Sequence, residues 1–516
     1  MGKLFTTLLL VDNFPVKPLD QIHFLAEHPV KTGTSRYRSF AVLRMQLASS
    51  VFGCGMAGSD STKSEVGVIG LDVTGRSVAL NLADHQFEVA ACDWGERQTP
   101  APPARVVRAA ANARELMANL RRPRTIFMVS SAGGTADSII EELLPGLEDG
   151  DLLMDAGNSY FKDTARRSRR LTERGVQFMG VGLAGGADGS RTGGIVMAGG
   201  GREARERTRP LLEALAATAR GQPCVCHLET AAAAHFAKMV HAGIEHALLQ
   251  LVSETFDLTQ RALPPGDGEM AGASGAWRAG ALNGYLMEMT GRGFETGDNP
   301  GPRQMLEQKL EAARQDAQGG WMARSALELE VSIPTIDAAV GTLAVGPAER
   351  QRRLMATPSR QPAGRLGNDA QSVLNEMQGA LQAAMIIAYA QGLALLAAAS
   401  KHHGFHYELD DLCRAWRGGA RLRTALLEDM AAALGATPDL PDLLCDEDMS
   451  EKVMARQEGL RRAVWRAYEL DMVVPALLAS LDYLDSNKGA WLPVNLIQAP
   501  RWQPAQVRLR ECVRTA

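Results

Sequence analysis

A succession of short apolar runs, separated by helical patterns, constrains this chain most. From Glu65 onward the runs are VGVIG, FEVAACD, TIFMVS, DLLMDAG and VQFMGVG, and segments with helical periodicity lie between them. Strands that alternate with helices form a parallel sheet with crossover helices. The pattern therefore predicts an α/β domain of the Rossmann-like type, with residues 64–232 as its bounds.

The chain changes character after about Ala231, where the strand signals stop. Long stretches rich in Ala, Leu and Met follow, such as NEMQGALQAAMIIAYAQGLALLAAAS. A chain of 516 residues is also too long for one compact core. We therefore expect a large all-α domain over residues 233–496 and a short C-terminal tail over residues 497–516.

Residues 1–63 look like neither domain. A lysine and the apolar run LFTTLLLV stand near the start, as in a targeting segment. However, Asp12, Asp20 and Glu27 are unusual in a transit peptide, and the run is short for a signal sequence. We interpret residues 1–63 as an extension that attaches the chain to a larger protein assembly. The extension does not determine the location of the protein in the cell, which could be the cytoplasm, a mitochondrion or another organelle.

Composition excludes several classes of function. A formal net charge of −4 gives no reason to expect nucleic-acid binding. We expect no membrane span, since no apolar run reaches about 18 residues. The seven cysteines are scattered and odd in number, which fits reduced thiols. Residues 224–227 read C-V-C-H, but no second ligand pair follows, so we predict a strand end there and no metal site.

The first run leads into GVIGLDVTGRSVALN, a glycine-rich turn between a strand and a helix. Such a turn places a dinucleotide pyrophosphate against the helix N-terminus. Gly70 and Gly75 supply the first and third glycines of the G-x-G-x-x-G pattern, but Asp72 holds the middle position. A carboxylate there would repel the pyrophosphate, and it could instead cap the helix itself.

The second run ends at Asp93, about twenty residues after the glycine turn. An acidic residue at this place usually accepts a hydrogen bond from the ribose 2′-hydroxyl and excludes a 2′-phosphate. Taken alone, Asp93 indicates NAD rather than NADP. An aspartate that simply opens a turn at a strand end explains the same residue equally well.

Several further blocks form a set: DAGNSYFKDTARRSRRL, GVGLAGGADGSRTGGIVMAGG, AKMVHAGIEHALLQL, YAQGLALLAAAS, WRGGARLR and LPVNLIQAPR. Together with the glycine turn, the set resembles the 6-phosphogluconate dehydrogenase family over residues 65–502. The resemblance implies a Rossmann-like domain, a helical domain that forms a homodimer, and a tail that reaches into the partner's site. It also implies oxidation of 6-phosphogluconate with NADP, decarboxylation to ribulose 5-phosphate, and a cytoplasmic location.

The same resemblance assigns chemistry to the segment KMVHAGIEHALLQ. It implies that Lys238 is the base and Glu245 the acid, and their spacing of seven residues places both on one face of a helix. It implies that His241 binds the substrate and that Asn158 lies near both cofactor and substrate. Without the resemblance, a polar stripe at a domain boundary would be the preferred interpretation.

The resemblance also implies that Gly185 and Gly186 bind the substrate, since they match a backbone turn that receives its carboxylate end. It implies the same role for His246, where the family has a tyrosine, and for Arg501 in the tail.

The departures from the family pattern gather at ligand positions. In the cofactor site, Asp72 replaces a small residue, Asp93-Trp94 replaces an Asn-Arg pair that holds the 2′-phosphate, and Ser130 replaces a lysine. In the substrate site, the family's phosphate-binding lysine and arginine align with Gly320 and Gly341. Further departures are Ala184, Ala242 and Val507.

Three interpretations follow. The first is a catalytically degenerate member that serves as a scaffold or accessory subunit and needs no cofactor. The second is an active dehydrogenase that prefers NAD and oxidises an unphosphorylated 3-hydroxy acid. The third is an ordinary NADP-dependent 6-phosphogluconate dehydrogenase whose phosphate ligands come from other positions. Losing a single charge-assisted hydrogen bond weakens binding by about 1.5–3 kcal/mol, which favours the first interpretation.

Overall fold

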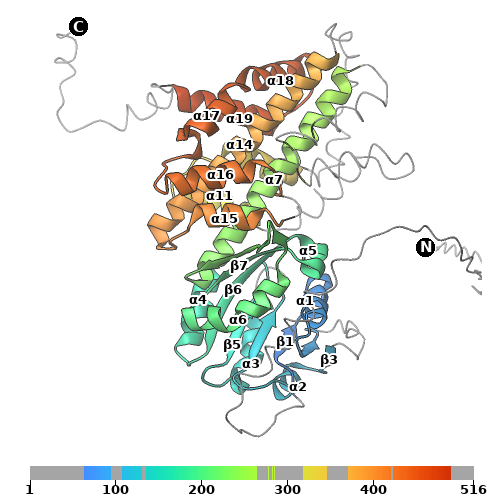
Figure 1. Ribbon diagram of the computed structural model, residues 1–516, viewed down its shortest axis with the longest axis vertical. Helices are drawn as coiled ribbons and strands as arrows, with labels where there is room; N and C mark the ends of the chain where they lie inside the picture. The colour runs from blue at the N-terminus through green and yellow to red at the C-terminus, as the bar shows by residue number, and fades with distance from the viewer. Residues whose placement is uncertain are drawn as a thin grey trace, which may run out of the picture. The chain divides into compact units, whose positions relative to one another are not determined.

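The computed structural model describes residues 63–94, 107–130, 135–263, 277, 282, 284, 318–345, 370–419 and 422–489. An α/β part comes first along the chain and an all-helical part follows it (Figure 1). This arrangement confirms the predicted fold class. Residues 1–62 and the tail beyond residue 489, including Arg501, lie outside the described residues.

The α/β part is built on one eight-stranded sheet with the order β10-β7-β6-β5-β4-β1-β2-β3. The strands are β1 (Val66–Ile69), β2 (Val89–Cys92), β3 (Val107–Ala109), β4 (Thr125–Met128), β5 (Leu152–Asp155), β6 (Gln177–Ala184), β7 (Ile195–Gly199) and β10 (Val225–Leu228). The first six are parallel to one another. A separate hairpin joins β8 (Thr218–Ala219) to β9 (Gln222–Pro223).

The sequence patterns identified β1, β2, β4, β5 and β6, but they did not predict that β7 runs antiparallel to β6. The physical reason is the short connection between the two strands, from residue 184 to residue 195. A parallel return needs a dozen or more residues, so the chain can only turn back alongside β6. The C-V-C-H segment lies at the beginning of β10, which agrees with the predicted strand end. A separate finding is that the described residues include no group of side chains suited to a metal ion.

Helices cover both faces of the sheet (Figure 1). Apolar side chains of α1 (Val73–Asp84) and α6 (Arg202–Leu215) pack with the strands in one core. Side chains of α2 (Ala113–Ala118) and α3 (Thr135–Leu143) pack in a second core on alternate strand residues. The remaining helices of this part are α4 (Phe161–Thr172), α5 (Gly186–Thr192) and the short 3₁₀ turn Leu144–Gly146.

The helical part is organised around two long helices, α7 (Ala231–Ala262) and α14 (Ala370–His403). They pack so closely that a Cβ on Gly392 would lie 2.5 Å from Ile244 Cδ1. The other helices are α11 (Gln318–Glu328), α12 (Pro334–Val345), α15 (Leu409–Trp416), α16 (Leu426–Ala436), α17 (Glu447–Met454), α18 (Gln457–Glu469) and α19 (Pro475–Lys488), with a 3₁₀ turn at Leu443–Cys445.

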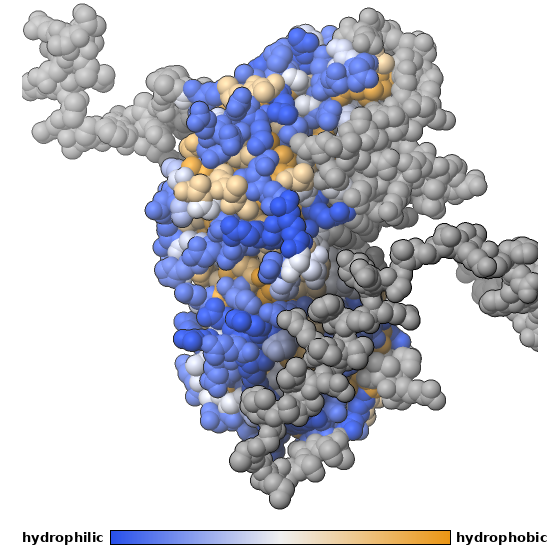
Figure 2. Space-filling model, in the orientation of Figure 1, coloured by the Kyte–Doolittle hydropathy of each residue, from blue (hydrophilic) through white to orange (hydrophobic). Residues whose placement is uncertain are grey.

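By length and apolar composition α14 is the one helix of the described chain that could cross a membrane, but 78% of its most apolar window is buried inside the protein. It is therefore placed as a core helix. The view in Figure 2 agrees with this, because hydrophilic residues cover most of the described surface and apolar ones gather in small areas over the helical part.

Glycines allow α7 to pack directly on the β6–β7 pair. A Cβ on Gly180 would lie 2.2 Å from Ala231 O, and one on Gly199 would lie 2.0 Å from Thr230 O. A Cβ on Gly182 would lie 2.7 Å from Lys238 Cβ. No other residue type fits at these distances, so the three glycines fix the height of α7 above the sheet and the place of Lys238.

A buried carboxylate links α7 to α19. Glu254 Oε1 accepts a hydrogen bond from Ala476 N at 3.0 Å and one from Gln250 Nε2 at 2.8 Å, and Oε2 accepts one from Leu477 N at 2.9 Å. A negative charge is favourable at this helix N-terminus. Burial nevertheless raises the pKa of Glu254 to about 7.

Replacing Gly180 by Ala is expected to destabilise the fold by about 1–3 kcal/mol, because the new methyl group overlaps the first turn of α7. The matched control is Gly320→Ala in α11, where no atom of the described residues lies within 4 Å of an added Cβ. That variant should gain about 0.5–1 kcal/mol from reduced chain entropy. Urea unfolding of both variants checks the account, and equal effects at the two glycines would contradict it.

Glu254 should make stability depend on pH near neutrality. Between about pH 4.5, its ordinary pKa, and about pH 7 the folded protein holds this proton while the unfolded chain does not. The unfolding free energy should therefore fall as the pH rises, by about 3 kcal/mol at about 1.4 kcal/mol for each pKa unit. In urea titrations from pH 5 to 8, Glu254→Gln should lack this fall, and the half-exposed Asp257→Asn should keep it. Parallel curves for wild type and Glu254→Gln would refute the assignment.

Candidate functional site

Most of the predicted site residues lie along one edge of the sheet, where β2, β1, β4, β5 and β6 end side by side. In that order the edge carries Asp93 after β2, Gly70 after β1, Ser130 after β4, Asn158 after β5, and Gly185 with Gly186 after β6. Ligands of open α/β sheets bind outside the carboxyl ends of the strands, so this edge is the candidate site.

The glycine turn after β1 is tight at both of its glycines. Gly70 has a φ of +91°, and a Cβ there would lie 2.0 Å from Val129 O. A Cβ on Gly75 would lie 1.8 Å from Gly70 O. The first glycine therefore allows the turn to pass the end of β4, and the second allows α1 to pack against that turn.

Asp72 is the N-cap of α1. Its Oδ1 accepts hydrogen bonds from Thr74 N and from Gly75 N, each at 2.9 Å. These amides are two of the donors that a helix leaves unpaired at its start and that bind anions in dinucleotide sites. The carboxylate of the chain itself therefore bonds two amides of the kind that bind anions at a helix start.

Asp93 connects the end of β2 to the same turn. Its Oδ1 accepts from Leu71 N at 3.0 Å and from Trp94 N at 2.9 Å. The first bond fits a carboxylate beside the ribose position, and the second fits a carboxylate that opens a turn. Both bonds come from amides of the chain itself, and the role of Asp93 at a ribose stays a prediction. The Trp94 side chain is partly buried against the core below α2 and α3.

Ser130 follows β4 and lies against the loop after β5. Its hydroxyl is buried and has no hydrogen-bond partner among the described residues. A Cβ on Gly157 would lie 2.7 Å from both Ser130 O and Ser130 Oγ, so the two loops are in direct contact. Asn158, the next residue, is exposed.

Helix α7 carries the proposed acid–base residues over the end of β6. Lys238 is half-buried, and its stem lies on Gly182. His241, Glu245 and His246 follow on the same helix and are buried at 2%, 8% and 4% exposure. A Cβ on Gly319 of α11 would lie 3.6 Å from His246 Nδ1, so this stretch faces α11.

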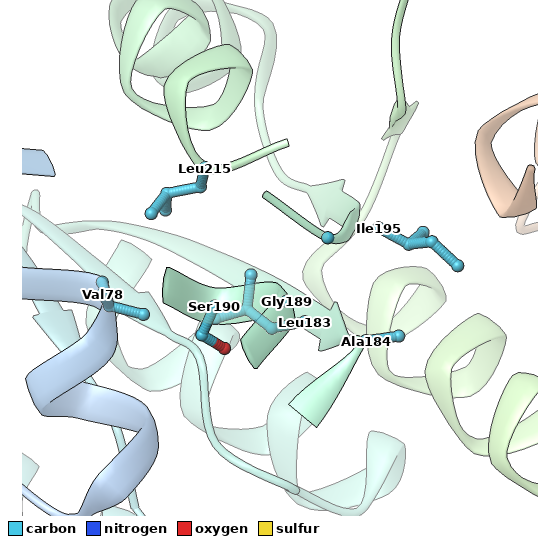
Figure 3. A pocket seen from close by; sticks show the side chains of 8 residues that line it. Val78, Leu183, Ala184, Gly189, Ser190, Ile195 and Leu215 are labelled. Carbon is cyan, nitrogen blue, oxygen red and sulfur yellow. The ribbon is translucent and has the colours of Figure 1, made fainter. Parts of the chain in front are cut away.

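The turn after β6 is formed by Gly185 and Gly186, with φ angles of +121° and +67°. It begins α5, which is fastened to α1. Asn81 Nδ2 donates to Ser190 O at 3.0 Å, and Arg191 Nη1 lies 2.6 Å from Asp84 Oδ2. Val78, Ser190 and Leu215 border a hollow between these helices that has no room for a water molecule (Figure 3). Helix α5, which follows the Gly185–Gly186 turn, is thus held against the second half of α1.

The two glycines at the family's cationic positions both face open space. Among the described residues, nothing lies within 4 Å of a Cβ built on Gly320 or on Gly341, and both residues are exposed. A Cβ would therefore meet no described neighbour at either position.

Sequence reasoning missed two contributors to this edge. Gly182 is needed for the position of Lys238, and its signal was a glycine inside a strand, which marks close approach of another backbone. Asp155, in the block DAGNS, organises the loop that carries Asn158, and its signal was an acidic residue at a strand end.

Two family models match this chain. Residues 65–228 match the model described as the NAD binding domain of 6-phosphogluconate dehydrogenase, and residues 234–502 match that of the 6-phosphogluconate dehydrogenase C-terminal domain.

Similar proteins cover most of the chain. A decarboxylating 6-phosphogluconate dehydrogenase of Synechococcus elongatus is 36% identical over 85% of this chain and 94% of the relative. An NADP(+)-dependent decarboxylating one of Bacillus subtilis is 33% identical over 85% of this chain and 95% of the relative. A solved Plasmodium falciparum 6-phosphogluconate dehydrogenase superposes with a TM-score of 0.75 at 27% identity, over 85% of this chain and 95% of that one.

Replacing Asp72 by Ala should remove the cap of α1 and lower the unfolding free energy by about 1 kcal/mol. Asp72→Asn should lose less, because an asparagine oxygen also accepts from helix amides. Chemical denaturation of the three proteins measures the difference. If Asp72→Ala were as stable as wild type, the carboxylate would not be bonded to the helix amides in solution.

Proposed function

This chain belongs to the 6-phosphogluconate dehydrogenase family, and from that premise we propose that it is a catalytically degenerate member. In this proposal it has kept the dehydrogenase body as a scaffold or accessory subunit. The body is a homodimer, as the family implies, and residues 1–63 are the element that attaches it to a larger assembly. The N-terminal domain is of the nicotinamide-dinucleotide-binding type.

The observation that supports the proposal most is the bonding of the Asp72 carboxylate to Thr74 N and Gly75 N. A pyrophosphate would have to displace this carboxylate and then lie beside it. Two unit charges 4 Å apart repel by about 1 kcal/mol in water and by about 4 kcal/mol near a protein surface. Each 1.4 kcal/mol is a tenfold loss of affinity, so binding would weaken by about one to three orders of magnitude.

The losses of cations point in the same direction. Trp94 stands where the family has an arginine for the 2′-phosphate, and its side chain is partly buried against the core. Gly320 stands where the family has a phosphate-binding lysine, and no described atom lies within 4 Å of a Cβ built there. A desolvated phosphate dianion needs several charged donors, and these positions supply none.

The experiment is a calorimetric titration of the full chain, first with NADH and separately with NADPH, in which the heat of binding is measured. Wild type should bind neither nucleotide at millimolar concentration. Asp72→Ala should gain affinity by at least tenfold, because the turn amides become free and the repulsion disappears. Asp72→Asn is the matched control, since it removes the charge but keeps the cap, and it should gain less. NADPH binding by wild type below about 0.1 mM would overturn the proposal.

A second candidate function is supported by the residues that remain. Lys238, His241, Glu245 and Asn158 match the family's catalytic positions, and Asp93 lies beside the glycine turn without a following arginine. These residues fit a dehydrogenase that uses NAD and oxidises an unphosphorylated 3-hydroxy acid. In it Lys238 would take the hydroxyl proton while hydride passes to NAD, and Glu245 would protonate the carbon from which CO₂ departs when the 3-keto acid is decarboxylated. Tight NADH binding with weak NADPH binding in the same titration would select this candidate.

A further inference from the structure

A buried ionic cluster lies directly behind the loop that carries Asn158. Asp155, at the end of β5, is fully buried, and Arg167 of α4 is 2% exposed. Arg167 Nη1 lies 3.3 Å from Asp155 Oδ2 and donates to Ser159 Oγ at 2.9 Å. Ser159 Oγ in turn donates to Asp155 Oδ2 at 2.7 Å. One guanidinium nitrogen therefore holds both the strand end and the far end of the loop.

The other two nitrogens of the Arg167 guanidinium group bind a second carboxylate. Its Nε and Nη2 donate to Asp137 Oδ1 and Oδ2 of α3, at 3.0 and 2.8 Å. This bidentate pair holds the pKa of Asp137 well below its usual range. The neighbouring Arg166 also pairs with Asp137, at 3.0 Å, but it is half-exposed and its other ion pair is with Asp163, at 3.4 Å. Arg166 thus offers a natural control.

The cluster fixes the loop on both sides of Asn158. Ala156 N donates to Met128 O at 2.8 Å, and Gly157 N donates to Asp155 Oδ1 at 3.1 Å. Ser159 is fixed by its bonds to Asp155 and Arg167. Asn158 lies between these fastened residues and is exposed toward solvent. The loop therefore has few ways to move that would not break a buried bond.

The same strand end also touches α7. Asp155 O lies 3.1 Å from His235 Nε2, and Thr164 Oγ1 of α4 lies 2.7 Å from His235 Nδ1. Burial lowers the pKa of His235, so the ring is neutral and Nε2 carries the proton for the carbonyl. His235 lies one helical turn before Lys238. Asp155 thus contacts both the loop that carries Asn158 and the helix that carries Lys238.

Stability alone does not account for such a cluster, because a buried ion pair is often no more stabilising than apolar residues of the same volume. We propose that Arg167 is a positioning residue of the site. Through Asp155 and Ser159 it holds Asn158 at a fixed place beside the start of α7. The inference rests on the proposed family site at this sheet edge, and it does not depend on whether a dinucleotide binds there.

Amide hydrogen exchange on the full chain tests the proposal, with the peptides that cover residues 153–160 as the readout. Arg167→Met should speed exchange at Ala156 and Gly157 by at least tenfold. Arg167→Lys should restore most of this protection, because its amine reaches Asp155 and Ser159 although it cannot form the fork on Asp137. Arg166→Met should leave residues 153–160 within twofold of wild type.

Because Arg167→Met leaves a buried carboxylate without its cation, the double variant Asp155→Asn/Arg167→Met is measured beside it. It removes both charges and should show the same tenfold loss of protection. If Arg167 only joined α3 to α4, exchange would rise in those helices, and residues 153–160 would stay within twofold of wild type in both variants. That result would overturn the positioning role. Failure of the proposed function would appear instead in the nucleotide titration, which these variants do not enter.

Discussion

The close approach of α7 to the β6–β7 pair is the constraint on which the site depends. Carbonyl oxygens of the helix start lie where side chains on Gly180 and Gly199 would have to be, and the stem of Lys238 lies on Gly182. Backbone contact of this kind leaves no freedom to slide the helix along the sheet. Lys238, His241 and Glu245 therefore keep their places at the end of β6 whatever happens at the neighbouring ligand positions.

The same sheet edge places residues that packing requires next to residues that a ligand would contact. The glycines that shape the turn after β1 are kept, because the turn could not pass Val129 without them. Asp72 lies between those glycines, at the position that caps α1. An aspartate is a favourable N-cap residue, and its carboxylate accepts hydrogen bonds from amides that could otherwise bind an anion. Packing and binding thus place separate demands on adjacent residues.

Much of this could be predicted from sequence, for identifiable reasons. The apolar runs of β1, β2, β4, β5 and β6 gave clear strand signals, and Asp72 after a strand is a typical N-cap residue. The three-residue β3 has one buried side chain and gave almost no signal. The direction of β7 depends on the length of the link before it.

The Asp155–Arg167 cluster joins groups that meet only after α4 has packed on the sheet, so no local pattern could show it. The roles of Lys238 and Glu245 came from the family resemblance, since spacing alone fits a polar stripe.

A crystal structure of the full chain grown with NADPH at millimolar concentration would test the central claim most directly. The account predicts that the Asp72 carboxylate remains on Thr74 N and Gly75 N and that no pyrophosphate is ordered at the start of α1. An ordered pyrophosphate on those two amides, with the Asp72 side chain turned away, would contradict it.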